Sequence, residues 1–166
     1  MAPGTIQKTI SLFRDAFDGL CVDISLLRLE ALGIMVHEAM TVQARSFHTP
    51  EHIFNLADAT NPIQALAALF HDVVYYEIDQ GFIPEIERVL MPYIDEVEGH
   101  LQLAAIPAGT DQLFDVVLAI FDFKVGQRLS PTEGQNEFLS TLLMVQKLKD
   151  TVKPRDLVKI AACIEA

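Results

Sequence analysis

The feature that most constrains the fold is the spacing of apolar residues, which follows helical periodicity in almost every segment of the chain. In residues 5–20, for example, Ile6, Ile10, Phe13 and Phe17 recur on one helical face, and Gly19 follows as a stop signal. No segment repeats the alternation of apolar and polar residues that is typical of half-buried strands. The pattern therefore predicts an all-α protein, with helices within residues 5–20, 23–41, 50–60, 62–78, 84–104, 110–123, 136–152 and 154–166.

Two of these expected helices carry specific local signals. Pro92 lies inside the segment 84–104 and predicts a kink there, because proline cannot donate the backbone hydrogen bond of a helix interior. Thr110 stands before the segment "DQLFDVVLAIFDF" and is a suitable N-cap residue.

Composition places the chain among globular proteins. It has 166 residues, of which 51% are hydrophobic and 21% charged, which suits one domain over residues 1–166. No apolar run reaches the roughly 18 residues that span a bilayer, and the N-terminal segment lacks the pattern of a signal peptide, so we expect a cytoplasmic protein without a membrane segment. The final segment stops within an apolar helical pattern, so we expect that the domain is truncated at the C-terminus or completed by a partner.

The charge of the chain limits its partners. Its formal net charge of −11 repels phosphate backbones, so a nucleic acid polymer is not expected as a partner. An anionic substrate would need a metal ion or a few arginines to offset this charge. Cys21 and Cys163 show no metal-ligand spacing and are expected to be reduced core residues.

Three of the five histidines gather in one region of the sequence. His48 and His52 are four residues apart, and His71 follows with Asp72 beside it. Imidazole nitrogen and carboxylate oxygen suit a divalent metal such as Zn, Mn, Fe, Ni or Mg, and three protein ligands would leave positions open for water. Because Pro50 disfavours helix at the residue before it, His48 is expected in a loop and His52 in the first helical turn.

These segments resemble a known family. "FHTPEH" and "LAALFHD" are similar to the HD-domain superfamily of metal-dependent phosphohydrolases, in the branch with a His-x3-His motif followed by Phe-His-Asp that is related to cyclic-nucleotide phosphodiesterases. A later Asn-Glu pair and serine also fit, after an insertion of roughly residues 77–130. The matching positions are Arg45, Phe47 (in place of the family's tyrosine), His48, His52, Ile53, Ala68, Phe70, His71, Asp72, Val74, Tyr75, Asn136, Glu137 and Ser140.

The resemblance implies an HD-domain-like helical bundle and a role for each site residue. His48 would be the general acid, and His52, His71 and Asp72 would be the metal ligands. Asn136 and Glu137 would lie near the site, and small phosphorylated molecules, nucleotides among them, would be the substrates.

One expected ligand does not match. The family uses a distal aspartate as its fourth ligand, and no aspartate after residue 137 has a suitable context. Asp150 and Asp156 lie in polar, surface-like segments, whereas Asp115 and Asp122 come too early in the order of motifs. The missing ligand would then lie beyond Ala166.

Several alternatives stay open at this point. His71 could be a buried histidine bonded to a backbone carbonyl, and Arg45 could hold a substrate phosphate or pair with a surface acid. Asn136 and Glu137 could simply open a helix, and Glu165 could face the site or be an ordinary terminal residue. For the whole chain, the alternatives to a phosphohydrolase are a degenerate HD domain that binds a ligand or partner without catalysis, and a structural helical module. The oligomeric state, including a homo-oligomer, also stays open.

Overall fold

The computed structural model describes residues 4–42, 50–57 and 60–166, and this part of the chain is predominantly α-helical. The all-α prediction is confirmed in that helices predominate, although the described residues also include one two-stranded hairpin. The described elements are α1 (Thr5–Gly19), α2 (Leu26–Met40), α3 (Pro50–Leu56), α4 (Pro62–Phe70), α5 (Tyr76–Asp79), α6 (Pro84–Leu90), β1 (Ile94–Val97), β2 (His100–Leu103), α7 (Gln112–Phe121), α8 (Gln135–Leu148) and α9 (Pro154–Glu165).

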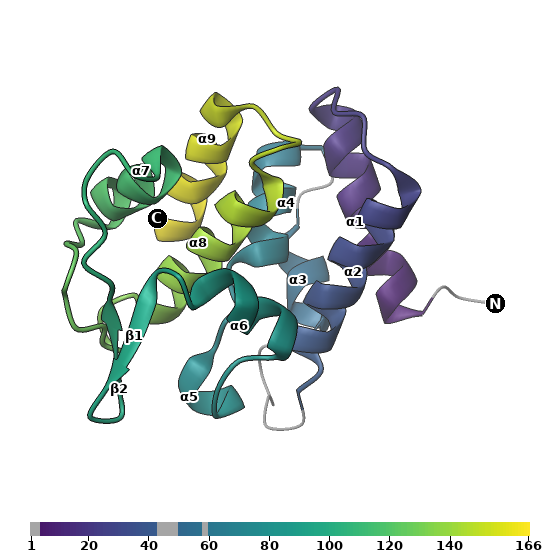
Figure 1. The fold of residues 1–166 in the computed structure, drawn as a ribbon. Helices are drawn as coiled ribbons and strands as arrows, with labels where there is room; N and C mark the ends of the chain where they lie inside the picture. The colour runs from purple at the N-terminus through teal and green to yellow at the C-terminus, as the bar shows by residue number, and fades with distance from the viewer. Residues whose placement is uncertain (1–3, 43–49, 58–59) are drawn as a thin grey trace.

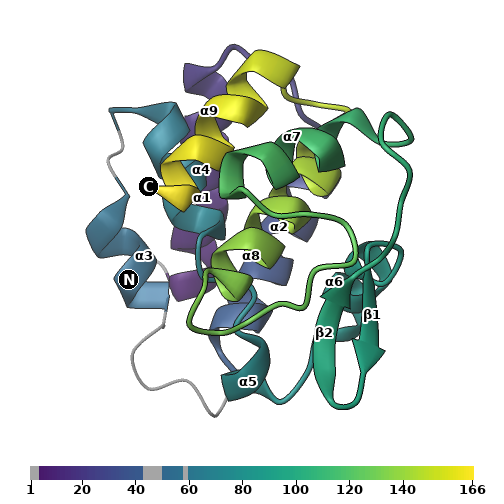
Figure 2. The same cartoon turned by 90° about the vertical axis from the view of Figure 1, so that its left-hand side faces the viewer.

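Helices α4 and α8 form the centre of the molecule. Every residue of α4 from 65 to 70 and of α8 from 138 to 145 is buried, so these stretches of the two helices are enclosed on all sides. Helix α4 packs against α1 and α9, and α8 packs against α6, α7 and α9. In Figure 1, α1 and α2 lie on one side of this centre and α7 and α9 on the other, while α5, α6 and the hairpin lie at the lower end. The view in Figure 2 shows α3 beside α4 at the edge of the bundle.

The helix ends follow local signals in the sequence. Proline occupies the first turn of α3, α4, α6 and α9, where its missing N–H is not needed. The Asn61 side chain caps α4 by accepting hydrogen bonds from the backbone N–H groups of Ile63 and Gln64. The prediction of Thr110 as the N-cap of α7 was one residue off, because the Asp111 side chain accepts the hydrogen bonds from Leu113 and Phe114.

The expected helix over residues 84–104 is wrong in its second half. Helix α6 ends at Leu90, and residues 94–103 form an antiparallel hairpin with Ile94 opposite Leu103 and Val97 opposite His100. Pro92 does not kink a helix here but follows its end. Glu98 and Gly99 connect the strands with φ values of 52° and 76°, which is the backbone of a two-residue type I′ turn.

Two further expectations concern exposure and membranes. Cys21 and Cys163 are free thiols, but both are exposed, so their assignment to the core was wrong.

Among the described helices, none has the length and apolar character needed to cross a membrane.

Candidate metal centre

Three of the predicted ligands meet at one point. His52 lies in the first turn of α3, and His71 and Asp72 follow directly after the last residue of α4. The distance from Asp72 Oδ2 to His71 Nε2 is 2.8 Å, and from Asp72 Oδ2 to His52 Nε2 it is 3.8 Å. One ligand atom from each residue lies within 4.8 Å of the other two, so the three could hold a metal ion.

Two other predicted site residues of this region are not among the residues that the structure describes. Arg45 and His48 fall within residues 43–49, which lie outside the described residues. Their predicted roles as phosphate-binding residue and general acid therefore stay predictions. His52 lies in the first turn of α3, as the position of Pro50 in the sequence predicts.

His71 is held in an orientation that suits metal binding. Its Nδ1 lies 2.8 Å from the carbonyl oxygen of Ala68 and donates a hydrogen bond to it, so Nε2 is directed to Asp72 and His52. A backbone carbonyl in this place fixes the tautomer of a ligand histidine. The interpretation of His71 as a carbonyl-bonded buried histidine and its interpretation as a ligand are thus compatible.

The protonation of His71 is set by its neighbours. Burial by itself lowers the pKa of His71, but the hydrogen bond and negative charge of Asp72, the Ala68 carbonyl and the charge of Glu137 outweigh burial and raise it. In the metal-free protein the imidazolium is therefore a natural partner for the buried Asp72 carboxylate. A cation at this site would replace that proton.

The helix expected over residues 62–78 was wrong beyond Phe70, so His71 and Asp72 do not lie within a regular helix. The helix ends at Phe70, and a turn follows in which the backbone N–H of Val73 donates to the Phe70 carbonyl at 3.1 Å. Beyond the turn, the N–H of Val74 donates to Ser140 Oγ at 3.0 Å and that of Tyr76 to Asn136 Oδ1 at 3.3 Å. These side chains of α8 replace the carbonyl acceptors of a continuing helix, so the chain can leave the helical path after α4 without leaving the N–H groups of Val74 and Tyr76 unpaired.

The residues at the start of α8 have two different roles: some hold the backbone after α4, and one lies near the cluster. Asn136 and Ser140 are buried and hold the backbone after the cluster, rather than acting as metal ligands. Glu137 lines a cavity of about 590 Å³ together with His71 and Glu165, so both glutamates lie near the cluster. The resemblance includes Ser140 but does not predict its hydrogen bond to Val74. The signal for that bond is the spacing of Asn136 and Ser140, which are four residues apart and hence on one helical face.

The four aspartates considered as a fourth ligand have other surroundings. Asp115 accepts a hydrogen bond from the N–H of Gly109 at 2.7 Å, and Asp122 is the exposed C-cap of α7. Asp156 lies 3.5 Å from Lys159 Nζ, and Asp150 is exposed. In the part of the chain that the structure describes, the cluster of possible ligands contains only His52, His71 and Asp72.

Comparisons with protein-family models, with curated proteins and with solved structures found no match for this chain. The functional interpretation therefore depends on the cluster and on the motifs that led to it.

Proposed function

We propose that this protein is a metal-dependent phosphohydrolase with an HD-type helical bundle, in which His52, His71 and Asp72 hold a divalent cation. The observation that supports the proposal is the meeting of these three side chains, with their ligand atoms within 4.8 Å of one another. Two imidazoles and one carboxylate are a donor set that suits Zn, Mn, Fe and Ni, with Mg the weakest candidate. The fixed tautomer of His71 also fits, because it leaves Nε2 toward the shared point.

The chemistry divides between the cation and the chain. Held by His52, His71 and Asp72, a divalent cation would supply Lewis acidity for the phosphoryl oxygen and a water of lowered pKa as the nucleophile. Three protein ligands leave coordination positions for water and substrate. By the resemblance to HD domains, His48 would protonate the leaving oxygen. The planar guanidinium of Arg45 suits a second role, the binding of the substrate phosphate.

The substrate would be a small phosphate ester, with nucleotides among the candidates, and the cytoplasm remains the predicted location. In the described part of the chain no aspartate adds a fourth ligand to the cluster. That observation favours the second candidate, a degenerate HD domain that binds a ligand or partner without turnover.

Metal analysis and turnover separate these proposals. The purified protein, stripped of metal and then reconstituted with Zn²⁺, Mn²⁺, Fe²⁺, Ni²⁺ or Mg²⁺ in turn, is analysed for bound metal by mass spectrometry. We expect about one tightly bound ion per chain, lost in His71→Ala and Asp72→Ala. His100→Ala is the matched control, because His100 is an exposed histidine of β2 outside the cluster.

The same samples are assayed for phosphate release from a panel of phosphate esters. Metal binding with metal-dependent phosphate release supports the hydrolase. Metal binding without release from any ester supports the degenerate domain. Failure to bind any of the five cations would contradict both and leave the structural module.

A further inference from the structure

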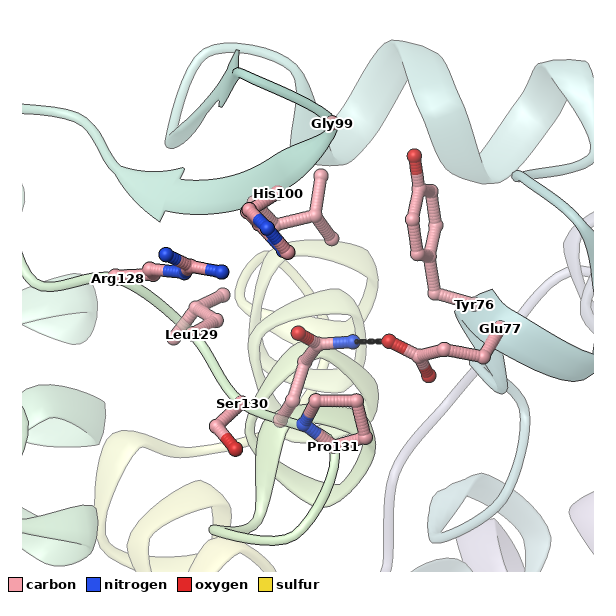
Figure 3. A pocket seen from close by; sticks show the side chains of 10 residues that line it. Tyr76, Glu77, Gly99, His100, Arg128, Leu129, Ser130 and Pro131 are labelled. Atoms are coloured by element: carbon pink, nitrogen blue, oxygen red, sulfur yellow. Dashed lines mark hydrogen bonds between the residues drawn. The ribbon is translucent and has the colours of Figure 1, made fainter.

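A cavity of about 610 Å³ lies at the hairpin end of the molecule, and none of the three cluster residues lines it. Figure 3 shows it between the hairpin, the loop that precedes α8 and the segment around Tyr76. Its volume falls in the range of roughly 300–1,000 Å³ that is typical of small-molecule sites.

Two nitrogen-rich side chains on this cavity come from neighbouring extended segments. The N–H of Leu129 donates to the Leu101 carbonyl at 2.8 Å, and that of Leu103 donates to the Gln127 carbonyl at 2.8 Å, so residues 127–129 run beside β2. In this pairing Arg128 lies opposite Gln102.

His100 is two residues from Gln102 and therefore shares a face with Arg128. Diagonal neighbours of this kind are roughly 7–8 Å apart, within reach of long side chains. In Figure 3 the side chains of His100 and Arg128 approach each other at one wall of the cavity.

The nitrogens of this pair have no partner within the described protein. Neither the Arg128 guanidinium nor the His100 ring makes an ion pair or hydrogen bond to a described residue. A guanidinium presents a planar fork of donors that matches a carboxylate or phosphate, and an imidazole adds a further donor. In a chain of net charge −11, this pair is a local group of cationic or hydrogen-bond-donating nitrogens that suits an anion.

The other walls of the cavity consist of apolar side chains and of polar side chains that are hydrogen-bonded to each other. Leu101, Leu129 and the ring of Tyr76 contribute apolar surface. On the far wall, the buried amide of Gln135 donates to Glu77 Oε1 at 2.6 Å, which holds both side chains in place (Figure 3). A ligand would thus meet donors at one end and an apolar surface beside them.

We propose that this cavity is a second ligand site, which binds a small organic anion. The carboxylate or phosphate of the ligand pairs with Arg128 and His100, and its apolar body lies against Leu101 and Tyr76. Glu77 opposes the binding of a second negative charge and so favours ligands with one anionic end. The site does not depend on the metal cluster or on the proposed hydrolase activity.

The test is a backbone amide NMR titration of the metal-free protein with two probes, benzoate and phenylphosphonate, and with benzyl alcohol as the uncharged control. The two anions distinguish a carboxylate ligand from a phosphate-type ligand. We expect shifts at Gly99, His100 and Leu129 at ligand concentrations below about 10 mM with at least one anion and not with benzyl alcohol.

Charge-matched variants test the assignment. Arg128→Gln should weaken the binding of the anion about tenfold, and His100→Gln should weaken it less. Arg14→Gln, which removes an exposed arginine of α1, should change it by less than about twofold. Glu77→Gln keeps an acceptor for Gln135 and should tighten binding, because it removes a negative charge from the cavity.

Three results would overturn the proposal. One is the absence of shifts at the cavity with either anion. Another is an equal loss of affinity in Arg14→Gln and Arg128→Gln, which would mean attraction to overall charge alone. The third is a set of shifts centred on His52 and His71, which would move the anion to the metal cluster. Folding of each variant is read from the unchanged amide shifts of α9 (Pro154–Glu165), which contains none of the substituted residues.

Discussion

The Asp72 carboxylate is buried, with 8% of its side chain exposed, and two imidazoles face it. A buried carboxylate is costly unless a positive group compensates it. Here the compensation comes either from a proton on His71 or from a cation shared by His52, His71 and Asp72. Both states use the same three side chains, which explains how the cluster can be well packed in a metal-free protein and still be competent for metal.

At the scale of single residues, one prediction concerns His48. In an active form of the protein, His48→Gln should leave metal content nearly unchanged and slow turnover by about 100-fold, the usual scale for a lost general acid. Metal analysis and steady-state kinetics on the same sample measure both effects, with His52→Gln as the matched variant that should lose metal. If His48→Gln loses the metal and His52→Gln retains it, the two assigned roles are exchanged.

A second residue-scale prediction concerns Asp111, which caps α7 and also accepts hydrogen bonds from the Tyr93 hydroxyl at 2.6 Å and the Gln146 amide at 2.9 Å. Burial alone would raise the pKa of Asp111, but the hydrogen bonds from Tyr93, Phe114 and Gln146 outweigh it and lower the pKa below the ordinary 3.8. A depressed pKa stabilises the folded state above pH 3.8, and this contribution is lost as the pH falls through the folded-state pKa.

Asp111→Asn keeps an oxygen acceptor for the helix cap. Its second oxygen is replaced by an NH2 group, which cannot accept the hydrogen bonds of the Tyr93 hydroxyl and the Gln146 amide. We therefore expect a loss of about 1–2 kcal/mol in the free energy of unfolding at pH 7, which shrinks below pH 4. Urea unfolding at a series of pH values measures it, and Asp150→Asn, at an exposed aspartate, is the control. A difference that stays constant down to pH 2 would show that the charge of Asp111 contributes nothing.

At the scale of elements, the start of α8 determines where the chain goes after α4. Ser140 and Asn136 accept the backbone hydrogen bonds of Val74 and Tyr76, so residues 71–75 form a turn instead of a further helical turn. Neighbouring Thr141 is equally buried, yet its hydroxyl has no hydrogen-bond partner among the described residues. The two adjacent hydroxyls therefore make a matched pair for experiment.

Ser140→Ala should lower the free energy of unfolding by about 1–3 kcal/mol, because it leaves the buried N–H of Val74 without an acceptor. It should also weaken metal binding, since the turn that carries Asp72 loses its tie to α8. Thr141→Val should be neutral or stabilising, because it removes a buried hydroxyl without a partner and keeps the shape. Equal effects of the two changes in urea unfolding would contradict the tie to Val74.

A close approach of α1 and α2 supports another prediction. A Cβ atom on Gly33 would lie 2.3 Å from Ile10 Cγ1 and 3.3 Å from Ile10 Cα. Helix propensity alone favours alanine over glycine by about 1 kcal/mol, whereas overpacking costs about 1–3 kcal/mol. We expect Gly33→Ala to destabilise the protein in thermal unfolding, and to be stabilising when it is made on an Ile10→Ala background; a stabilising effect in the wild-type background would refute the clash.

The elements differ in how well the sequence predicts them. Amphipathic patterns and proline positions placed most helices correctly, because both signals are local. The hairpin at residues 94–103 was missed, since its turn residues are Glu98 and Gly99 rather than the common Asn-Gly, and its apolar alternation is short. Likewise, the turn at His71 depends on acceptors in α8 that lie more than sixty residues away in the sequence, which no local pattern contains. The motif spacing nevertheless predicts the three residues that cluster, His52, His71 and Asp72.

On the scale of the whole molecule, the cluster joins parts of the fold that differ in their packing. His71 and Asp72 follow the buried helix α4, whereas His52 belongs to α3, a short helix at the edge of the bundle. A cation held by all three residues would connect this edge to the centre. The unfolded chain has no such arrangement, so metal binding should raise the stability of the entire domain.

We therefore expect Zn²⁺ at about 100 times its dissociation constant to add about 2.7 kcal/mol to the free energy of unfolding. For a chain of this size that corresponds to a rise of about 5–10 °C in Tm. Scanning calorimetry with and without Zn²⁺ measures the rise, which should disappear in Asp72→Ala and His71→Ala. It should persist in His100→Ala and Arg128→Gln, whose side chains line the separate cavity. If Asp72→Ala keeps the full rise, Zn²⁺ binds at another place, and the three side chains form only a hydrogen-bonded cluster that holds α3 against the end of α4.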